Sequence, residues 1–244
     1  MLAELNEIGT KNVVLEVRGR VADQTAEPQI DFGYFRSSPN MESYRSFVMG
    51  ARQMGMTVVL RFVLTLPDGK TFVRPAPKDL ERFYTNYYRF VDAYMSVAER
   101  SGVGQVTIGV GLAAIACQRP ELLSHLIALV KKKFHGGLGF DFQSVEDFKS
   151  NSHCVDFVKG QFQDIGVDLP VNPQAADAEL ILKNNLRLSL VAFDGEDQNE
   201  KAVAFLSSLP NDVANGMFKG PAMTFGIFNP NPYLTGVKDF SETP

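Results

Sequence analysis

The chain has 244 residues, 45% of them hydrophobic and 21% charged, which fits one soluble α/β domain with a sizeable core. Its formal net charge of −4 lacks the basic surplus that binds phosphate backbones, so we expect no nucleic-acid partner. The N-terminus, Met1–Glu7, is acidic where a secretory or mitochondrial leader would be basic, and no apolar run reaches membrane-spanning length. We therefore expect no signal peptide, no transmembrane segment and no membrane partner. A cytoplasmic location is allowed, and the compartment stays open.

Apolar segments that alternate with helical stretches predict a parallel sheet built from βα units. In chain order, the expected strands are Asn12–Arg18, Thr57–Leu64, Gln105–Gly109, Gly137–Gln143, Val155–Phe162, Leu186–Asp194 and Ala222–Asn229. The clearest expected helices between them are Met41–Met54, Asp79–Ser101 and Pro120–Phe134. Because the units repeat to the end of the chain without a break, we predict a single domain over residues 1–244 with the fold of a (β/α) barrel.

No residue pattern predicts a metal or a cofactor. Cys117 and Cys154 lie in different units and match no metal-ligand spacing, which favours buried packing over a disulfide or a reactive thiol. The three histidines, His125, His135 and His153, share no ligand spacing either. The segment Gly109–Ala114 formally matches the G-x-G-x-x-A dinucleotide fingerprint, but the next helix is expected only from Pro120. We therefore expect neither a bound metal nor a bound cofactor.

Several segments resemble a known group of enzymes. Ala51–Arg61, Phe83–Glu99 and Val103–Leu112 resemble the middle of glycoside hydrolase TIM barrels of the two-carboxylate clan, with the greatest similarity to the mannanase-like family 113. Cys154–Val158 is similar to the strand that these enzymes write as Val-Asp-Phe-Ile-Gly. The resemblance implies a (β/α)8-type TIM barrel in which Asn12–Arg18 corresponds to strand 2, so that the first strand is lacking and seven βα units remain.

The resemblance also implies a pair of catalytic carboxylates, and the chain departs from that pattern. Retaining members carry an acid/base Glu after strand 4 and a nucleophilic Glu after strand 7, about 5 Å apart. Here Gly111 stands at the acid/base position, while Asp194 or Glu196 lies near the nucleophile position, and the chain has no Trp for sugar stacking. These departures predict a catalytically degenerate barrel that acts as a binding or structural subunit. The alternative is an active retaining glycosidase on β-linked, manno-type polysaccharide that takes its acid from Asp141 or Asp164.

Polar residues near the strand ends form a candidate binding surface. In a parallel barrel these ends lie on one face, where a carbohydrate ligand would bind. The candidate ligand-binding residues are Arg18, Arg61, Gln143, Gln161 and Asn229. A second interpretation stays open for Arg61, because Arg61 and Asp141 can also form a buried ion pair inside the barrel.

The expected strand number raises the question of closure. A barrel of this type needs eight strands, and seven leave two edges with unpaired backbone groups. We expect one of three elements to cover them: an N-terminal segment absent here, the C-terminal segment Pro230–Pro244, or a partner chain, which includes a second copy of this chain. We favour a homo-oligomer, a partner chain or an unusual local closure.

Overall fold

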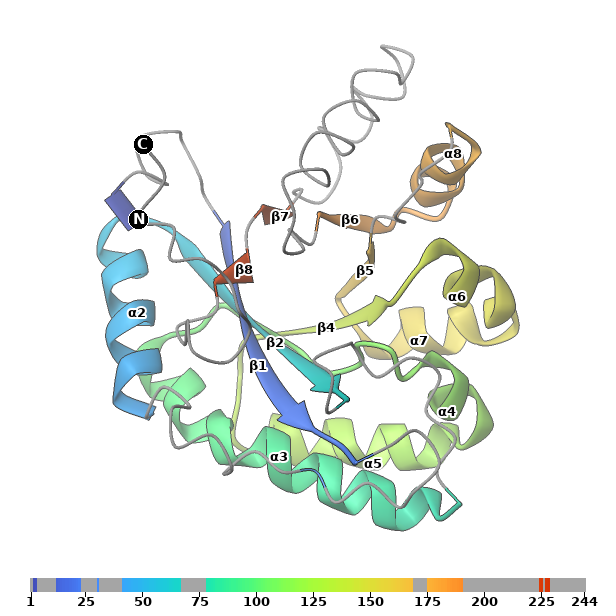
Figure 1. Ribbon diagram of the computed structural model, residues 1–244, viewed down its shortest axis with the longest axis horizontal. Coiled ribbons are helices and arrows are strands. Elements are labelled where there is room, and N and C mark those ends of the chain that lie inside the picture. The colour runs from blue at the N-terminus through green and yellow to red at the C-terminus, as the bar shows by residue number, and fades with distance from the viewer. Residues whose placement is uncertain are drawn as a thin grey trace.

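The computed structural model describes residues 2–3, 12–22, 30, 41–66, 78–168, 175–190, 224–225 and 227–228. These residues form one parallel sheet with helices along its outside (Figure 1). The strands are β1 (Asn12–Arg20), β2 (Thr57–Thr65), β3 (Gln105–Thr107), β4 (Gly137–Phe142), β5 (Asp164–Asp168), β6 (Arg187–Leu190), β7 (Thr224–Phe225) and β8 (Ile227–Phe228). Their order in the sheet is β7-β6-β5-β4-β3-β2-β1-β8, so neighbours in the chain are neighbours in the sheet from β1 to β7. This is the arrangement of a TIM barrel.

The two ends of the sheet are successive parts of the same chain segment. β7 pairs with β6 through Thr224 and Phe225, and β8 pairs with β1 through Ile227 and Phe228. Only residue 226 separates β7 from β8. Among the described residues, the sheet is not closed between β7 and β8. The predicted open edge at the strand from Asn12 does have a paired neighbour, which is β8.

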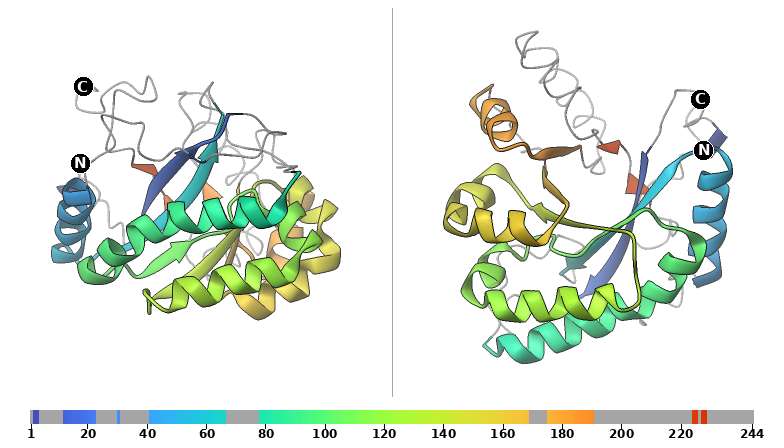
Figure 2. Two further views of the ribbon diagram at one scale, coloured as in Figure 1. Left: turned by 90° about the horizontal axis from the view of Figure 1, so that it is seen from below. Right: turned by 180° about the vertical axis from the view of Figure 1, so that it is seen from behind.

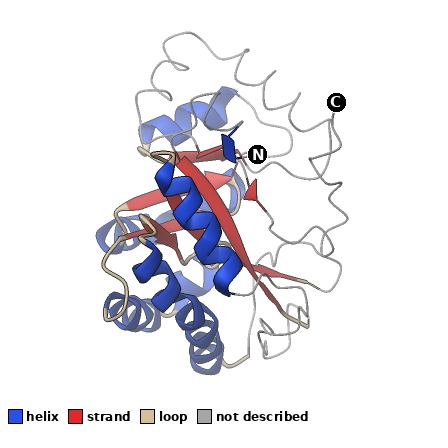
Figure 3. Ribbon diagram, turned by 90° about the vertical axis from the view of Figure 1, so that its left-hand side faces the viewer, coloured by secondary structure: helices blue, strands red, loops and turns tan. Residues whose placement is uncertain are grey.

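The helices surround the sheet and bury their apolar sides against it (Figures 2 and 3). They are α2 (Met41–Gln53), α3 (Leu80–Ser101), α4 (Ala113–Gln118), α5 (Pro120–Lys131), α6 (Val145–Ser150), the short 3-10 helix η1 (Ser152–Cys154), α7 (Val155–Gln161) and α8 (Ala175–Lys183). None of the described helices combines the length and the apolar character needed to cross a bilayer.

Helix α3 shows how local sequence defines these elements. Asp79 caps its start by accepting a hydrogen bond from the backbone N–H of Arg82 at 3.0 Å. Gly102 ends it with a φ of 72° and donates its N–H to the carbonyls of the last turn. The aromatic residues at three- and four-residue spacing face the sheet, as the sequence predicts, and Tyr87 and Phe90 are fully buried.

The prediction of a strand over Val155–Phe162 is wrong. Val155–Gln161 is helix α7, and the strand of this unit is β5, which begins at Asp164. The burial pattern explains the error, because Val155 and Val158 are buried at helical spacing while Asp156 is exposed. The resemblance through Cys154–Val158 therefore falls on a helix and not on a strand.

The interpretation of the cysteines is also wrong. Cys117 and Cys154 form a disulfide with their Cα atoms 5.6 Å apart. They are 37 residues apart in the sequence, but α4 and α6 pack against each other outside the sheet, and η1 follows α6 directly. The spacing in the sequence could not indicate this contact, which depends on how successive βα units pack.

The aromatic layer between α3 and the sheet supplies a test of the packing. The Phe90 ring lies 5.4 Å from the Phe62 ring and 6.1 Å from the Tyr87 and Tyr94 rings, centroid to centroid. Phe90→Ala should lower the free energy of unfolding by about 3–5 kcal/mol, because the cavity forms in a closed aromatic layer. Urea denaturation of this variant and of the adjacent exposed-residue control Arg89→Ala measures the effect. Equal stability of the two variants would contradict the packing described.

Candidate functional site

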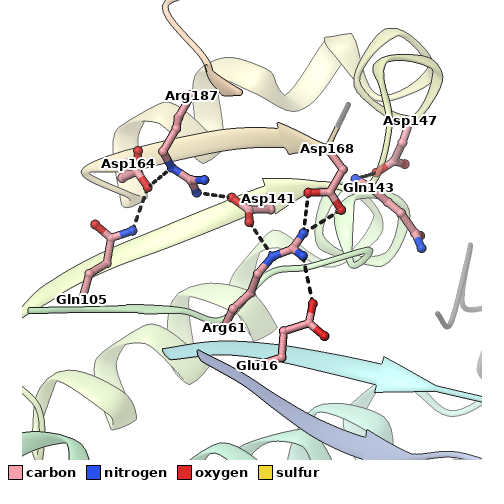
Figure 4. Close-up of polar contacts among 9 residues, drawn as sticks. All are labelled: Glu16, Arg61, Gln105, Asp141, Gln143, Asp147, Asp164, Asp168 and Arg187. Atoms are coloured by element: carbon pink, nitrogen blue, oxygen red, sulfur yellow. Dashed lines mark hydrogen bonds and ion pairs between the residues drawn. The ribbon is translucent and has the colours of Figure 1, made fainter. Parts of the chain in front are cut away.

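The barrel interior contains an arginine surrounded by carboxylates (Figure 4). Arg61 on β2 donates its Nε–H to Asp141 Oδ2 at 2.8 Å and its Nη1–H to Glu16 Oε1 at 3.2 Å. Its Nη2 lies 2.6 and 2.7 Å from the two carboxylate oxygens of Asp168. The Arg61 side chain is only 4% exposed, so these charge-assisted bonds replace the water that its guanidinium loses on burial.

Two further arginines extend this cluster. Arg187 on β6 donates to Asp141 Oδ1 at 2.6 Å and to Asp164 Oδ2 at 2.8 Å. Arg18 on β1 pairs with Glu16 at 2.9 Å. We call this set the barrel ion-pair network; its members are Glu16, Arg18, Arg61, Asp141, Asp164, Asp168 and Arg187.

The strand register brings these side chains together. Glu16 on β1 is the register partner of Arg61 on β2, and Gly166 on β5 is the partner of both Asp141 and Arg187. Register partners point to the same side of a sheet. A Cβ atom at Gly166 would lie 2.4 Å from Asp141 Oδ1 and 2.7 Å from Arg187 Nη2. The missing side chain of Gly166 therefore leaves the space in which Asp141 and Arg187 meet.

The network contains four carboxyl groups and three guanidinium groups, so it carries excess negative charge if every member is ionised. Burial raises the pKa of Asp168 to about 6, and the attraction of Arg61 offsets only part of this effect. The charges of Asp141 and Glu16 raise the pKa of Asp168 further. Asp168 thus takes up a proton more readily than Asp141, whose pKa is lowered.

For Asp141 and Arg61, the charges of neighbouring groups outweigh the effect of burial on the pKa. Burial alone would raise the pKa of Asp141, but Arg187 and Arg61 together hold it below its ordinary value. Burial alone would lower the pKa of Arg61, but Asp168, Asp141 and Glu16 together hold it above its ordinary value. The Asp141 carboxylate and the Arg61 guanidinium therefore form the charged centre of the network.

The structure places the predicted site residues at different depths. Arg61 and Asp141 form the buried ion pair that the sequence left open as an alternative. Arg18 lies nearer the C-terminal end of β1 than Glu16 and is 32% exposed. Gln143 follows β4, is half-buried and donates its backbone N–H to the Asp147 side chain at 3.1 Å.

The remaining predicted site residues do not join this group. Gln161 is the last residue of α7, before β5 begins, so its expected position at the C-terminal end of a strand is wrong. Asp194, Glu196 and Asn229 lie outside the described residues. Gly111 follows β3 and donates its N–H to the backbone carbonyl of Asp141 at 3.4 Å. The acid/base position of the resemblance is thus beside the network.

Sequence reasoning missed three members of the network as site residues: Glu16, Asp168 and Arg187. Glu16 carried a signal, because it is the one charged residue among Val13–Val17 of an apolar strand. Arg187 carried a similar signal, because it is a charged residue between Leu186 and Leu188 at the start of an apolar strand. Asp168 was missed because the strand of this unit was predicted at Val155–Phe162, before Asp168 in the chain.

The fold is similar to that of known glycoside hydrolases. The GH113 β-mannanase AaManA from Alicyclobacillus acidocaldarius, solved in complex with ManMIm, is 14% identical with a TM-score of 0.66, covering 87% of this chain and 76% of that one. A second GH113 β-1,4-mannanase is 17% identical with a TM-score of 0.59, covering 78% of this chain and 64% of its own. The GH53 catalytic domain from Ignisphaera aggregans is 15% identical with a TM-score of 0.56, covering 93% and 76% of the two chains.

No protein family model matches the chain, and no curated protein matches it in sequence. The similarity therefore establishes the fold: this chain has a TIM-barrel fold like that of these mannanases and of the GH53 domain. This confirms the resemblance to family 113 at the level of fold.

Removing the central carboxylate should destabilise the protein. Asp141→Asn replaces two oxygen acceptors by one oxygen and one amide, whose N–H groups would then face a guanidinium donor. We expect the free energy of unfolding to fall by about 3 kcal/mol, as for other broken buried ion pairs. Denaturant unfolding at neutral pH measures this. The matched variant Asp168→Asn should cost less, because it removes the excess negative charge, and a larger loss for Asp168→Asn would contradict this assignment.

The raised pKa of Asp168 predicts a pH dependence. A carboxyl group whose folded pKa lies above its unfolded value stabilises the fold fully below the unfolded pKa and loses this contribution as pH rises through the folded pKa. The wild type should therefore lose about 1–3 kcal/mol relative to Asp168→Asn between about pH 4 and about pH 7. Unfolding curves of both proteins across this range give the difference. A difference independent of pH would show that Asp168 is not perturbed.

Proposed function

We propose that this protein is a catalytically degenerate glycoside-hydrolase-like barrel that acts as a binding or structural subunit, with a carbohydrate as its ligand. The observation that carries the proposal is Gly111, which stands where the resemblance places the acid/base Glu. A glycine has no group that can transfer a proton to a glycosidic oxygen. Cleavage with retention needs two carboxyl groups that face the scissile bond, so the loss of one removes the standard mechanism.

The backbone at Gly111 adds to this argument. Its φ is 69°, in the left-handed region that side chains with a Cβ rarely adopt. The following N–H of Leu112 bonds to the carbonyl of Gly109 at 3.1 Å, which closes a tight turn before α4. This turn suits glycine, and a Glu at this position would strain it.

The carboxyl groups proposed to replace the missing acid are poorly suited to that task. The Asp141 side chain is 0% exposed and bonds to both Arg61 and Arg187, so a sugar oxygen cannot reach it in this conformation. Asp164 begins β5 and thus lies at the N-terminal end of the strand, away from the face where barrel enzymes act. Neither residue supports the enzyme alternative.

The described part of the C-terminal face favours binding. On β1, Glu16, Arg18 and Arg20 point to the same side at alternate positions, and the latter two are half-buried, whereas Glu16 is buried. Gln143 at the end of β4 is also half-buried. Guanidinium and amide groups donate hydrogen bonds well to sugar hydroxyls. Arg18, at the exposed edge of the ion-pair network, would bind the ligand together with Arg20 and Gln143.

A second candidate function rests on Asp168. It ends β5 on the C-terminal face, and its pKa of about 6 is suited to a group that both gives and takes a proton. Because Asp168 is buried and bonded to Arg61, its use as an acid requires that the side chain leave this contact. In this alternative the protein is an active retaining glycosidase on β-linked, manno-type polysaccharide, with Asp168 as the relocated acid and Asp194 or Glu196 as the nucleophile.

We also propose that residues 1–244 form one domain, since β7 and β8, near the end of the chain, complete the sheet that β1 begins. The prediction of a homo-oligomer or a partner chain rested on two open sheet edges. Because β6 pairs with β7 and β1 pairs with β8, that argument is weaker than the sequence suggested.

The two functions predict different results with the same substrates. Purified protein is incubated with activated aryl β-glycosides and manno-oligosaccharides, and calorimetry measures the binding of the same oligosaccharides. We expect binding without turnover, and we expect Arg18→Ala to weaken binding about tenfold, or 1.4 kcal/mol. Exposed Arg89→Ala serves as the control. Turnover that disappears in Asp168→Asn, Asp194→Asn or Glu196→Gln would overturn the proposal in favour of the glycosidase.

A further inference from the structure

Three potential metal-ligating side chains meet outside the barrel, on helices and not on the strands that carry the ion-pair network. The sulfur atoms of Cys117 and Cys154 and a ring nitrogen of His153 all lie within 4.8 Å of one another. Among the described residues, this is the one group of three His, Cys, Asp or Glu side chains with such a geometry. The cysteines are the chain's only two, and the structure shows them joined in a disulfide.

We propose that, when this disulfide is reduced, Cys117, His153 and Cys154 bind a thiophilic divalent cation such as Zn²⁺. The disulfide and the metal site are then two alternative states of one cross-link. Tetrahedral zinc with two thiolates and one imidazole places its ligand atoms about 3.5–3.8 Å apart. All three ligand atoms already lie within 4.8 Å of one another, and breaking the covalent bond lets the two sulfur atoms separate to the tetrahedral spacing.

The chemistry balances in two steps. A dithiol reductant supplies two electrons and two protons to the Cys117–Cys154 disulfide and is itself oxidised to a disulfide. The two thiols then each release a proton as their sulfur atoms coordinate Zn²⁺, and neutral His153 coordinates through its ring nitrogen. Two thiolates balance the charge of the divalent cation, so the occupied site is neutral.

The surroundings suit an accessible site. His153 is exposed, Cys117 is half-buried and Cys154 is buried, so an ion can enter from solvent and meet its deepest ligand last. No hydrogen bond or ion pair ties the His153 ring to another described residue outside this group. Three protein ligands leave a fourth position for water, which is the pattern of open zinc sites.

The location gives the cross-link a structural consequence. Cys117 lies in α4, which begins two residues after Gly111, and Cys154 lies at the junction of η1 and α7, which leads into β5. A metal bridge would hold these two segments together under reducing conditions, where the disulfide is lost. The proposal does not depend on whether the barrel binds or cleaves a carbohydrate.

Cobalt substitution tests the proposal with the full chain. The protein is reduced with a dithiol, desalted without oxygen and titrated with Co²⁺, and then with Zn²⁺ as a competitor. We expect a thiolate-to-cobalt charge-transfer band and the visible bands of tetrahedral Co²⁺ at one ion per chain, and we expect Zn²⁺ to abolish both. The untreated disulfide form has no thiols and should show neither band, which provides a control that needs no variant.

Two variants and a matched control complete the test. His153→Ala should weaken Co²⁺ binding at least about tenfold, and Cys117→Ser should remove the charge-transfer band. His125→Ala changes an exposed histidine on α5 and should leave binding unchanged. Circular dichroism checks the fold of each variant. The proposal fails if the reduced protein binds Co²⁺ no better than the disulfide form, or if His153→Ala binds as tightly as the wild type.

Discussion

The ion pairs of Arg61 inside the barrel are the interaction on which the rest of the structure depends. A buried guanidinium is tolerated only when carboxylates replace its water, and here Glu16, Asp141 and Asp168 do so from three different strands. These contacts require β1, β2, β4 and β5 to keep one register, because a slip of one residue would turn each charge to the other side of the sheet. The network thus fixes the inside of the barrel while the aromatic layer under α3 supplies apolar burial.

The same network shapes what the barrel can do. The buried carboxyl groups of the network are bonded to arginines, and Asp141 in particular accepts hydrogen bonds on both oxygens. Gly111 lies against the backbone of Asp141, because the Gly111 N–H donates to the Asp141 backbone carbonyl. The similarity to the GH113 mannanase concerns the fold.

Much of the fold could be predicted from the sequence, and the site only in part. Hydrophobic periodicity indicated β1, β2, α3 and β4 because each is long or strongly patterned. It failed at Val155–Gln161, because the apolar pattern of this short segment fits a strand as well as a helix. The pair of Arg61 and Asp141 could be expected from two charges in apolar strands, but the roles of Glu16 and Arg187 depend on strand register. The disulfide depends on helix packing between units, which no local pattern records.

The measurement that tests this account most directly is a pH titration of the aspartate carboxyl carbons by ¹³C NMR, with Asp141→Asn and Asp168→Asn used for assignment. The account predicts that Asp168 titrates with a pKa of about 6 and that Asp141 stays ionised below the ordinary aspartate pKa. An Asp168 that titrates at the ordinary value of about 3.9, or an Asp141 that titrates above it, would contradict the network as the organising feature of the barrel.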